Sequence, residues 1–167
     1  MIVLGLDTST KTGLVALKCT KLGGPIEVLC AEELQCKGDE KGLDRCSVLA
    51  EQMMGYVCKC KPDKVVFENY GFANAYTLAT LVEIGTVLRY FIKQSGIPYD
   101  LVPPNNLKKF VSGKGTSKKE DMKLAVYKGW GFEHKSNNVI DAYGLALYGL
   151  GKYGMLKMTK YQVDSIV

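Results

Sequence analysis

The sequence predicts one α/β domain spanning residues 1–167, and two patterns lead to that fold class. Three short apolar runs, separated by turn-forming residues, open the chain and are typical of an antiparallel meander of strands. Beyond them, amphipathic helical patterns alternate with short apolar strands, as in a sheet covered by helices. A composition of 47% hydrophobic and 23% charged residues is typical of a globular protein and argues against disorder.

The first strand is expected over residues 2–7, where four apolar residues and a glycine lead to Asp7. A polar turn follows and ends in a glycine, and the next two strands are expected over residues 14–17 and 26–30. A carboxylate at the end of a buried strand needs a cation or a hydrogen-bond donor. Asp7 is therefore either a cap of the turn or a ligand of an ion.

The next two elements are a helix and a strand that repeats the pattern of the first strand. Residues 43–60 form the helix, because apolar residues recur there at helical spacing, at Cys46, Leu49, Ala50, Met53 and Val57. Residues 64–68 form the strand, an apolar run that ends in Glu68. Two buried strands that each deliver a carboxylate indicate a shared site more strongly than one does.

A long helix is expected over residues 70–95, and it carries two apolar stripes. A helix that is apolar on two sides is buried on two sides. One stripe can pack on the sheet, and the other is then available for a symmetric dimer contact. A fifth strand over residues 97–102 ends at two prolines, and a lysine-rich loop follows it.

Basic residues concentrate in that loop and in the helix after it. Ser117 and Glu120 have the spacing of a capping box, so this helix is expected to begin near Lys118 and to end before Gly129 or Gly131. Its first turn combines lysines with free amides and would attract an anion. The formal net charge of +5 is small but unevenly distributed along the chain. The lysine cluster is either a phosphate-binding surface or an ordinary solvated loop. The lysines of the cluster are Lys108, Lys109, Lys114, Lys118 and Lys119.

The last expected helix covers residues 138–151 and presents Asn138, Asp141 and Leu145 on one face. An amide and a carboxylate one turn apart can point at the same ion. The alternative is a surface cap, in which Asn137 or Asn138 starts the helix and Asp141 favours its positive end.

Cysteine spacing and hydropathy indicate the compartment. Of six cysteines only Cys58 and Cys60 are close in sequence, and His134 is the single histidine, so free thiols are expected rather than zinc or disulfides. No apolar run reaches the roughly 18–20 residues that span a bilayer, and no signal-peptide pattern opens the chain. A reducing cytoplasm is therefore the expected setting. The tail from about residue 153 shows no clear motif.

The acidic residues together predict a metal site built from oxygen ligands. Carboxylates without cysteine or histidine partners favour Mg²⁺ or Mn²⁺ over zinc. Two such ions about 4 Å apart can activate a water and stabilise the leaving oxygen of an in-line phosphodiester cleavage. Nearby lysines would hold the phosphate backbone.

Several short pieces of the sequence resemble the RuvC family of Holliday-junction resolvases, within the RNase H-like superfamily. The resemblance runs from about residue 2 to residue 153, and its specificity lies in the order and spacing of the pieces. The pieces are Gly-Leu-Asp-Thr-Ser at 5–9 with Gly13, Val-Val-Phe-Glu at 65–68, Gly-Lys-Gly at 113–115 followed by Lys118 and Lys119, and Asp-Ala-Tyr-Gly-Leu-Ala at 141–146. The family implies an RNase H-like fold with a five-stranded mixed sheet, three antiparallel strands then two parallel, flanked by helices.

The resemblance also implies an activity and a set of site residues. A family member is a homodimer that binds a four-way DNA junction and nicks two opposing strands symmetrically, with a metal-activated water as the nucleophile. By position, the ligands of two Mg²⁺ or Mn²⁺ ions would be Asp7, Glu68, Asn138 and Asp141. Lys118 resembles the catalytic or phosphate-holding lysine, with Lys119 as the second choice. An aromatic residue after the glutamate resembles the one that opens the junction, and Phe72 is favoured over Tyr70.

Asn138 departs from the family pattern, in which the fourth ligand is usually Asp or His. An amide oxygen can bind Mg²⁺ or Mn²⁺ without adding charge. Asn138 is a natural and weaker ligand, a substitution that inactivates the enzyme, or the mark of a junction-binding protein that cuts poorly, in that order of preference. Short chains of the phage and viral branch also cut forks and flaps, and a phage enzyme acting in the host cytoplasm is expected.

Three other interpretations remain open. A sugar-kinase or actin-like ATPase shares the first motif, but those folds need two subdomains and further phosphate loops. A nuclease that processes ribosomal RNA precursors shares the first strand but lacks the lysine and Asp-Ala helix pattern. A catalytically silent junction-binding module rests on Asn138 alone.

Overall fold

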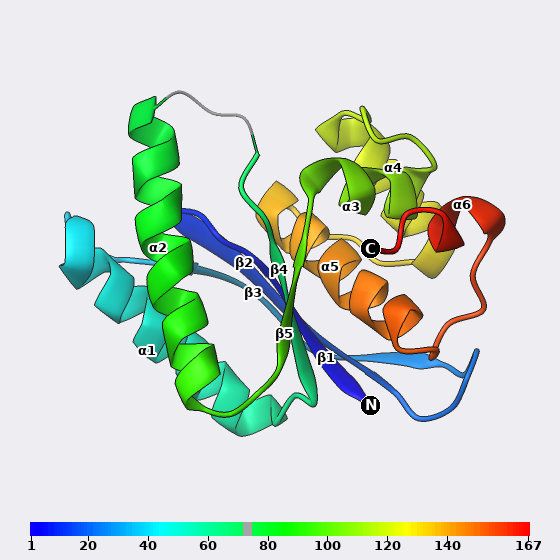
Figure 1. Ribbon diagram of the computed structural model, residues 1–167, viewed down its shortest axis with the longest axis horizontal. Coiled ribbons are helices and arrows are strands. Elements are labelled where there is room, and N and C mark those ends of the chain that lie inside the picture. Colours follow the sequence, from blue (N-terminus) through cyan, green and yellow to red (C-terminus); the bar gives the residue numbers. More distant parts are fainter. Residues whose placement is uncertain (72–74) are drawn as a thin grey trace.

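The computed structural model describes residues 1–71 and 75–167, and a five-stranded sheet forms its centre (Figure 1). The strands are β1 (Ile2–Asp7), β2 (Lys11–Cys19), β3 (Ile26–Gln35), β4 (Lys64–Glu68) and β5 (Tyr99–Val102). Their order across the sheet is β3-β2-β1-β4-β5. The first three strands are antiparallel neighbours, whereas β1, β4 and β5 run parallel. The predicted mixed sheet is confirmed.

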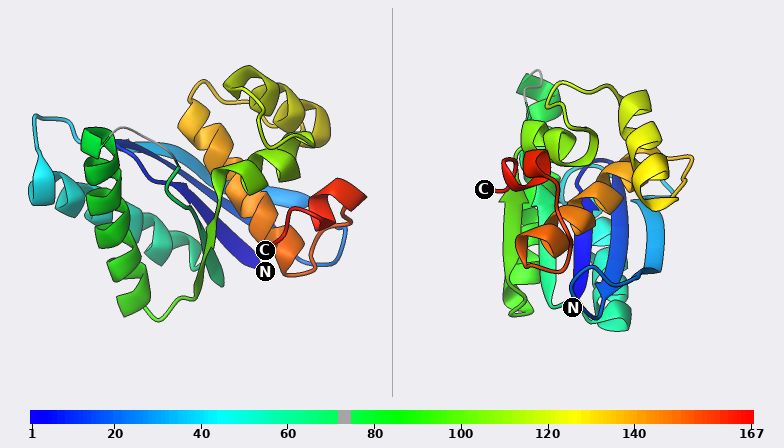
Figure 2. Two further views of the ribbon diagram at one scale, coloured as in Figure 1. Left: turned by 45° about the horizontal axis from the view of Figure 1, so that its top comes forward. Right: turned by 90° about the vertical axis from the view of Figure 1, so that its right-hand side faces the viewer.

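Helices cover both faces of the sheet, as Figures 1 and 2 show. The helices are α1 (Gly42–Cys60), α2 (Ala75–Gln94), α3 (Pro104–Ser112), α4 (Lys119–Trp130), α5 (Asn137–Lys152) and α6 (Lys160–Val163). Helices α1 and α2 lie on one face, and α5 lies on the other with α3, α4 and α6 around it. Among the described residues, none of these helices is both long and apolar enough to cross a membrane.

Strand residues divide between two hydrophobic cores because side chains alternate across a sheet. Val3 and Val66 are fully buried in the core under α5, whereas Leu4 and Phe67 are buried in the core under α1 and α2. Full burial of each such side chain contributes about 1.5–3 kcal/mol. The same alternation turns the last residues of β1 and β4 toward α5.

Two glycines let α5 lie directly on the backbone of the sheet. A methyl group added at Gly5 would come within 2.0 Å of the carbonyl oxygen of Ala142, and one at Gly13 within 2.0 Å of that of Asn138. Any larger residue at either position would push α5 away from the strands. These glycines therefore set how closely the side chains on α5 approach the end of β1.

Helix α3 occupies the segment that the sequence was expected to leave as a loop, so that prediction is wrong. Pro104 takes the first turn, where its missing N–H is not needed. Leu107, Phe110 and Val111 are buried at positions i, i+3 and i+4. Two lysines lie between these residues in the sequence, so the apolar stripe was not recognised from the sequence pattern.

Several element boundaries also differ from expectation. The predicted capping box at Ser117 is wrong: the backbone N–H of Lys118 donates to Asp121 Oδ2 at 3.0 Å, and α4 begins one residue later. Ser117 instead donates its hydroxyl to the carbonyl of Lys114 at 2.9 Å, within the loop before the helix. The cap of α5 is Ser136, whose hydroxyl accepts from the N–H of Val139, rather than an asparagine.

The C-terminal tail packs onto α3 and α5. The Tyr148 hydroxyl on α5 donates to the carbonyl of Ser165 at 3.1 Å and accepts from the N–H of Val167 at 2.8 Å. The Asn106 side chain on α3 also donates to the carbonyl of Ser165, at 2.9 Å. These bonds attach a segment without a sequence motif to the core under α5.

A candidate active-site cleft of carboxylates and lysines

The C-terminal ends of β1 and β4 lie side by side because these strands are parallel neighbours. Leu6 pairs with Phe67, so Asp7 and Glu68 follow at adjacent positions and point toward α5. Asp141 lies on α5 and lines the same cleft, which has a volume of about 700 Å³. The fold thus brings together three carboxylates that are far apart in sequence.

Asp7 and Glu68 share a hydrogen bond between their side chains. Burial, the charge of Glu68 and the charge of Asp141 raise the pKa of Asp7 well above its ordinary value. Burial and the charge of Asp141 likewise raise the pKa of Glu68 to about 7. A hydrogen bond between two carboxyl groups needs a proton on one of them, and the raised pKa values keep that proton available near neutral pH.

Two lysines act electrostatically on these carboxylates. Burial raises the pKa of Asp141 to about 6, and the positive charges of Lys119 and Lys108 oppose that rise. Lys119 also lowers the pKa of Asp7, and Lys108 that of Glu68. The cleft therefore combines half-buried carboxyl groups with cations from two different helices.

The remaining lysines of the sequence cluster lie at three different places. Lys118 lines the same cleft. Lys109 turns toward the tail, where its ammonium lies 3.5 Å from the carbonyl oxygen of Asp164. Lys114 lines a neighbouring hollow between α3 and α4. Lys108, Lys118 and the lysine after it are the members that meet the carboxylates in one cleft.

Asn138 also lines the cleft, and a hydrogen bond fixes the orientation of its amide. Its Nδ2 donates to the carbonyl oxygen of Lys11 at 2.6 Å, across the turn between β1 and β2. Because a carbonyl only accepts, the nitrogen must face Lys11, and Oδ1 is the atom left for a ligand. An aspartate here would set an acceptor against an acceptor, so the asparagine suits its position.

The donors in the cleft fit Mg²⁺ or Mn²⁺ in chemistry, because all of them are oxygen atoms. Among the described residues, no three acidic, histidine or cysteine side chains already converge into a ready-made ion site. Asp7 and Glu68 nonetheless interact closely, and a cation bound between them would offset the burial and repulsion that raise their pKa values.

Tyr70, one of the two aromatics expected to act at the junction, is held against α2. Its hydroxyl donates to the carbonyl of Val82 at 3.2 Å and accepts from Arg89, whose guanidinium lies 4.9 Å from the ring centroid. A methyl group at Gly85 would come within 2.8 Å of this hydroxyl. Phe72, the favoured candidate, lies outside the described residues.

The fold has counterparts among proteins of known structure. RuvC of Thermus thermophilus superposes with a TM-score of 0.76 at 21% identity, covering 95% of this chain and 100% of RuvC. The same protein in complex with a Holliday junction substrate gives a TM-score of 0.77 at 22% identity, covering 88% of this chain and 91% of RuvC. The Fowlpox virus resolvase, in complex with its substrate Holliday junction, gives 0.59 at 13% identity, with 89% and 98% covered.

These likenesses establish the fold class. The chain has an RNase H-like fold, with the mixed sheet and flanking helices that the sequence predicted. More particularly, its architecture is that of the RuvC resolvases, which the yeast mitochondrial resolvase Ydc2 also matches at a TM-score of 0.60 and 14% identity, with 86% and 76% covered. No protein-family model matches the sequence, and no curated protein matches it significantly.

Proposed function

We propose that this protein is a divalent-metal-dependent, structure-specific DNA endonuclease that resolves four-way junctions and also cuts other branched DNA such as forks and flaps. One observation carries the proposal: three half-buried carboxylates and three lysines meet in one cleft of a RuvC-like fold. Solved structures of Thermus RuvC and Fowlpox virus resolvase, both complexes with Holliday junctions, share that fold.

Asp7, Glu68, Asn138 and Asp141 would hold the Mg²⁺ or Mn²⁺ ions in this mechanism. When bound, such ions activate a water and stabilise the leaving oxygen of the cleaved phosphodiester. In the metal-free protein the raised pKa values favour a proton on this pair, and loss of that proton would leave both strand carboxylates charged to hold the ions. The amide of Asn138 adds an oxygen without adding charge.

The lysines orient and neutralise the phosphate that is cut. We assign the role closest to the chemistry to Lys119, because its charge acts on both Asp7 and Asp141. Lys118, the choice from sequence, would bind the same phosphate backbone from the start of α4, and Lys108 would do so from α3. Lys109 and Lys114 would contact DNA further from the cleft.

A homodimer would present two such clefts for symmetric nicks. The support is the exposed apolar surface on α2, where Tyr90 is 57% exposed and Phe91 40% exposed, and on the edge strand β5, where Leu101 is 37% exposed. Exposed apolar side chains on neighbouring elements suit a two-fold contact. Phe91→Glu should reduce the mass measured by light scattering at micromolar concentration from a dimer to a monomer, whereas a wild-type monomer would contradict the dimer.

Asn138 favours a second candidate function, a junction-binding protein that cuts weakly. A neutral ligand gives less attraction for a dication than the carboxylate that the family places there. Action in the cytoplasm, of a host cell if the gene is a phage gene, remains a prediction from the sequence.

A cleavage panel tests the proposed function. Equal concentrations of four-way junction, fork, flap and linear duplex DNA, together with structured RNA, are incubated with the protein and Mg²⁺ or Mn²⁺. We expect paired nicks in the junction and slower cutting of forks and flaps. Junction binding without cleavage would favour the second candidate, and equal rates on junction and duplex would remove the structure selectivity.

A further inference from the structure

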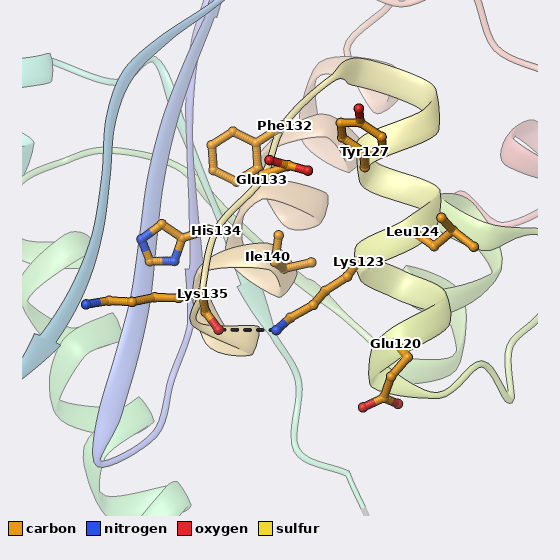
Figure 3. A pocket seen from close by; sticks show the side chains of 9 residues that line it. All are labelled: Glu120, Lys123, Leu124, Tyr127, Phe132, Glu133, His134, Lys135 and Ile140. Atoms are coloured by element: carbon orange, nitrogen blue, oxygen red, sulfur yellow. Dashed lines mark hydrogen bonds between the residues drawn. The ribbon is translucent and has the colours of Figure 1, made fainter.

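A second hollow lies beside the carboxylate cleft, and its lining contains none of the proposed metal ligands or phosphate-binding lysines. This hollow, the α4 groove, has a volume of about 810 Å³ and runs between α4 and the loop that leads to α5 (Figure 3). Helix α4 contributes Lys123, Leu124 and Tyr127 to its walls, and the loop contributes Phe132 and His134. The groove is therefore built by α4 and the loop, with Ile140 of α5 as a further lining residue.

The walls of the α4 groove combine firmly held and exposed apolar surface. The ring of Phe132 stacks on buried Tyr143, with centroids 4.1 Å apart and planes 6° from parallel. Tyr127 is 52% exposed and Leu124 is 51% exposed. In the view of Figure 3, Phe132 and Tyr127 lie toward the same end of the groove, away from the Lys123 hydrogen bond. A flat ring entering there finds aromatic partners.

Polar groups in the α4 groove offer both a donor and acceptors. His134 accepts the N–H of Ser136 at its Nδ1, at 3.1 Å, so the neutral ring carries its proton on Nε2 and can donate it. The Glu133 carboxylate can accept. Lys123 donates to the carbonyl of Lys135 at 3.2 Å and joins the two walls.

The charges of the groove fit a nucleobase better than a phosphate. Lys123 and Lys135 are balanced by Glu120 and Glu133 among the lining residues. A phosphate site needs an excess of positive charge, whereas a base is neutral and is recognised by stacking together with donors and acceptors at its edge.

The α4 groove adjoins the carboxylate cleft. Glu120 lines both, and Lys119, at the start of α4, acts on the carboxylates. Tyr127 follows Lys119 by eight residues of helix, which is roughly 12 Å along the axis or about three stacked nucleotides. A DNA strand held in the cleft therefore reaches the groove within a few nucleotides.

We propose that the α4 groove binds one unpaired nucleobase of a branched DNA, stacked on Tyr127 beside Phe132 and about three nucleotides from the phosphate held at the cleft. This inference rests on the proposed function in that it takes DNA as the ligand. It adds a binding contribution for branches that contain unpaired nucleotides, such as forks and flaps, which a fully paired four-way junction cannot use.

Fluorescence of 2-aminopurine tests this base site without any need for cleavage. The probe is an unpaired 2-aminopurine three nucleotides from the branch point of a fork, titrated with protein in EDTA. We expect the wild type to quench the emission. Tyr127→Ala should abolish the quenching and weaken fork binding by about tenfold, with binding of the fully paired junction changed less than about twofold. Tyr127→Phe should keep both properties.

A matched control and four outcomes complete the test. Tyr161→Ala on α6 removes another partly exposed tyrosine and should leave the quenching intact. Wild-type binding without quenching, or an equal loss of affinity for fork and junction in Tyr127→Ala, overturns the proposal and leaves the groove to a protein partner. Quenching without cleavage in Mg²⁺ supports the base site while the nuclease function fails, and cleavage without quenching does the reverse.

Discussion

Replacing Glu68 by glutamine should stabilise the metal-free protein at pH 8 and abolish its activity. The reason is that ionising this carboxyl group in the folded protein is unfavourable, because it is half-buried and faces the charge of Asp141. Glutamine has nearly the same shape and carries no charge. A residue retained for an ion should therefore reduce stability when no ion is bound.

The magnitude follows from the pKa of Glu68, which rises from an ordinary 4.5 to about 7. One pKa unit corresponds to about 1.4 kcal/mol, so the charged form lowers the unfolding free energy by about 3 kcal/mol at pH 8. The folded state holds its proton more tightly, so this contribution to stability is complete below pH 4.5 and is lost as the pH rises through 7. Burial of the amide offsets part of the gain, which leaves about 1–3 kcal/mol.

Urea unfolding in EDTA at fixed protein concentration, at pH 5 and pH 8, measures this difference. We expect the unfolding free energy of Glu68→Gln to exceed that of the wild type at pH 8 and to approach it at pH 5. Saturating Mg²⁺ should reverse the order at pH 8, because only the wild type keeps all the ligands. The exposed Glu51 on α1 is the matched control, and Glu51→Gln should change neither value.

Two results would refute this reasoning. A Glu68→Gln protein less stable than the wild type at pH 8 would mean that the carboxylate is a stabilising group of the fold. A difference of the same size at pH 5 and pH 8 would mean that ionisation is not its cause.

Three further substitutions test other parts of the site. Asn138→Asp should lower the unfolding free energy of the metal-free protein at pH 8 by about 1–3 kcal/mol, because the new carboxylate faces the carbonyl that begins β2. The same variant should bind Mg²⁺ more tightly by calorimetry. If neither metal affinity nor cleavage rate changed, the assignment of Asn138 as a ligand would fail. Gly13→Ala should cost about 3 kcal/mol or more by urea unfolding because it pushes α5 off the sheet, whereas Gly55→Ala, with open space around it, should be neutral or stabilising. Lys119→Ala should slow junction cleavage about 10²-fold and Lys118→Ala much less, and the opposite order would return the catalytic role to Lys118.

The sheet was predictable because its signals are local. Apolar runs of strand length, each ending at an acid or a turn, fixed β1 and β4, and Asp7 and Glu68 followed from the same pattern. Helix α3 was missed because Lys108 and Lys109 dominate a nine-residue segment whose buried face consists of three residues. A cluster of charged residues is easily recognised in a sequence, whereas an apolar stripe of three residues within it gives a much weaker pattern.

The contacts between distant segments could not be predicted in the same way. The hydrogen bond from Asn138 to Lys11 spans 127 positions, and no local pattern distinguishes it from a surface cap. The close approach of α5 to Gly5 and Gly13 is indicated in the sequence only by the presence of a glycine inside each apolar strand. The choice between Lys118 and Lys119 depends on the residue at which α4 begins. Asp121 caps this helix start in place of the expected Ser117, so the helix begins one residue later than predicted.

The most direct measurement is the single-turnover rate of four-way junction cleavage in Mg²⁺ by the wild type and by Asp7→Asn, each at saturating protein. Junction affinity of both proteins is measured in EDTA, so that binding and chemistry are separated. We expect Asp7→Asn to bind the junction as the wild type does and to cut it at least about 10³-fold more slowly. Cleavage by Asp7→Asn at the wild-type rate would contradict the assignment of the carboxylate cleft as the active site.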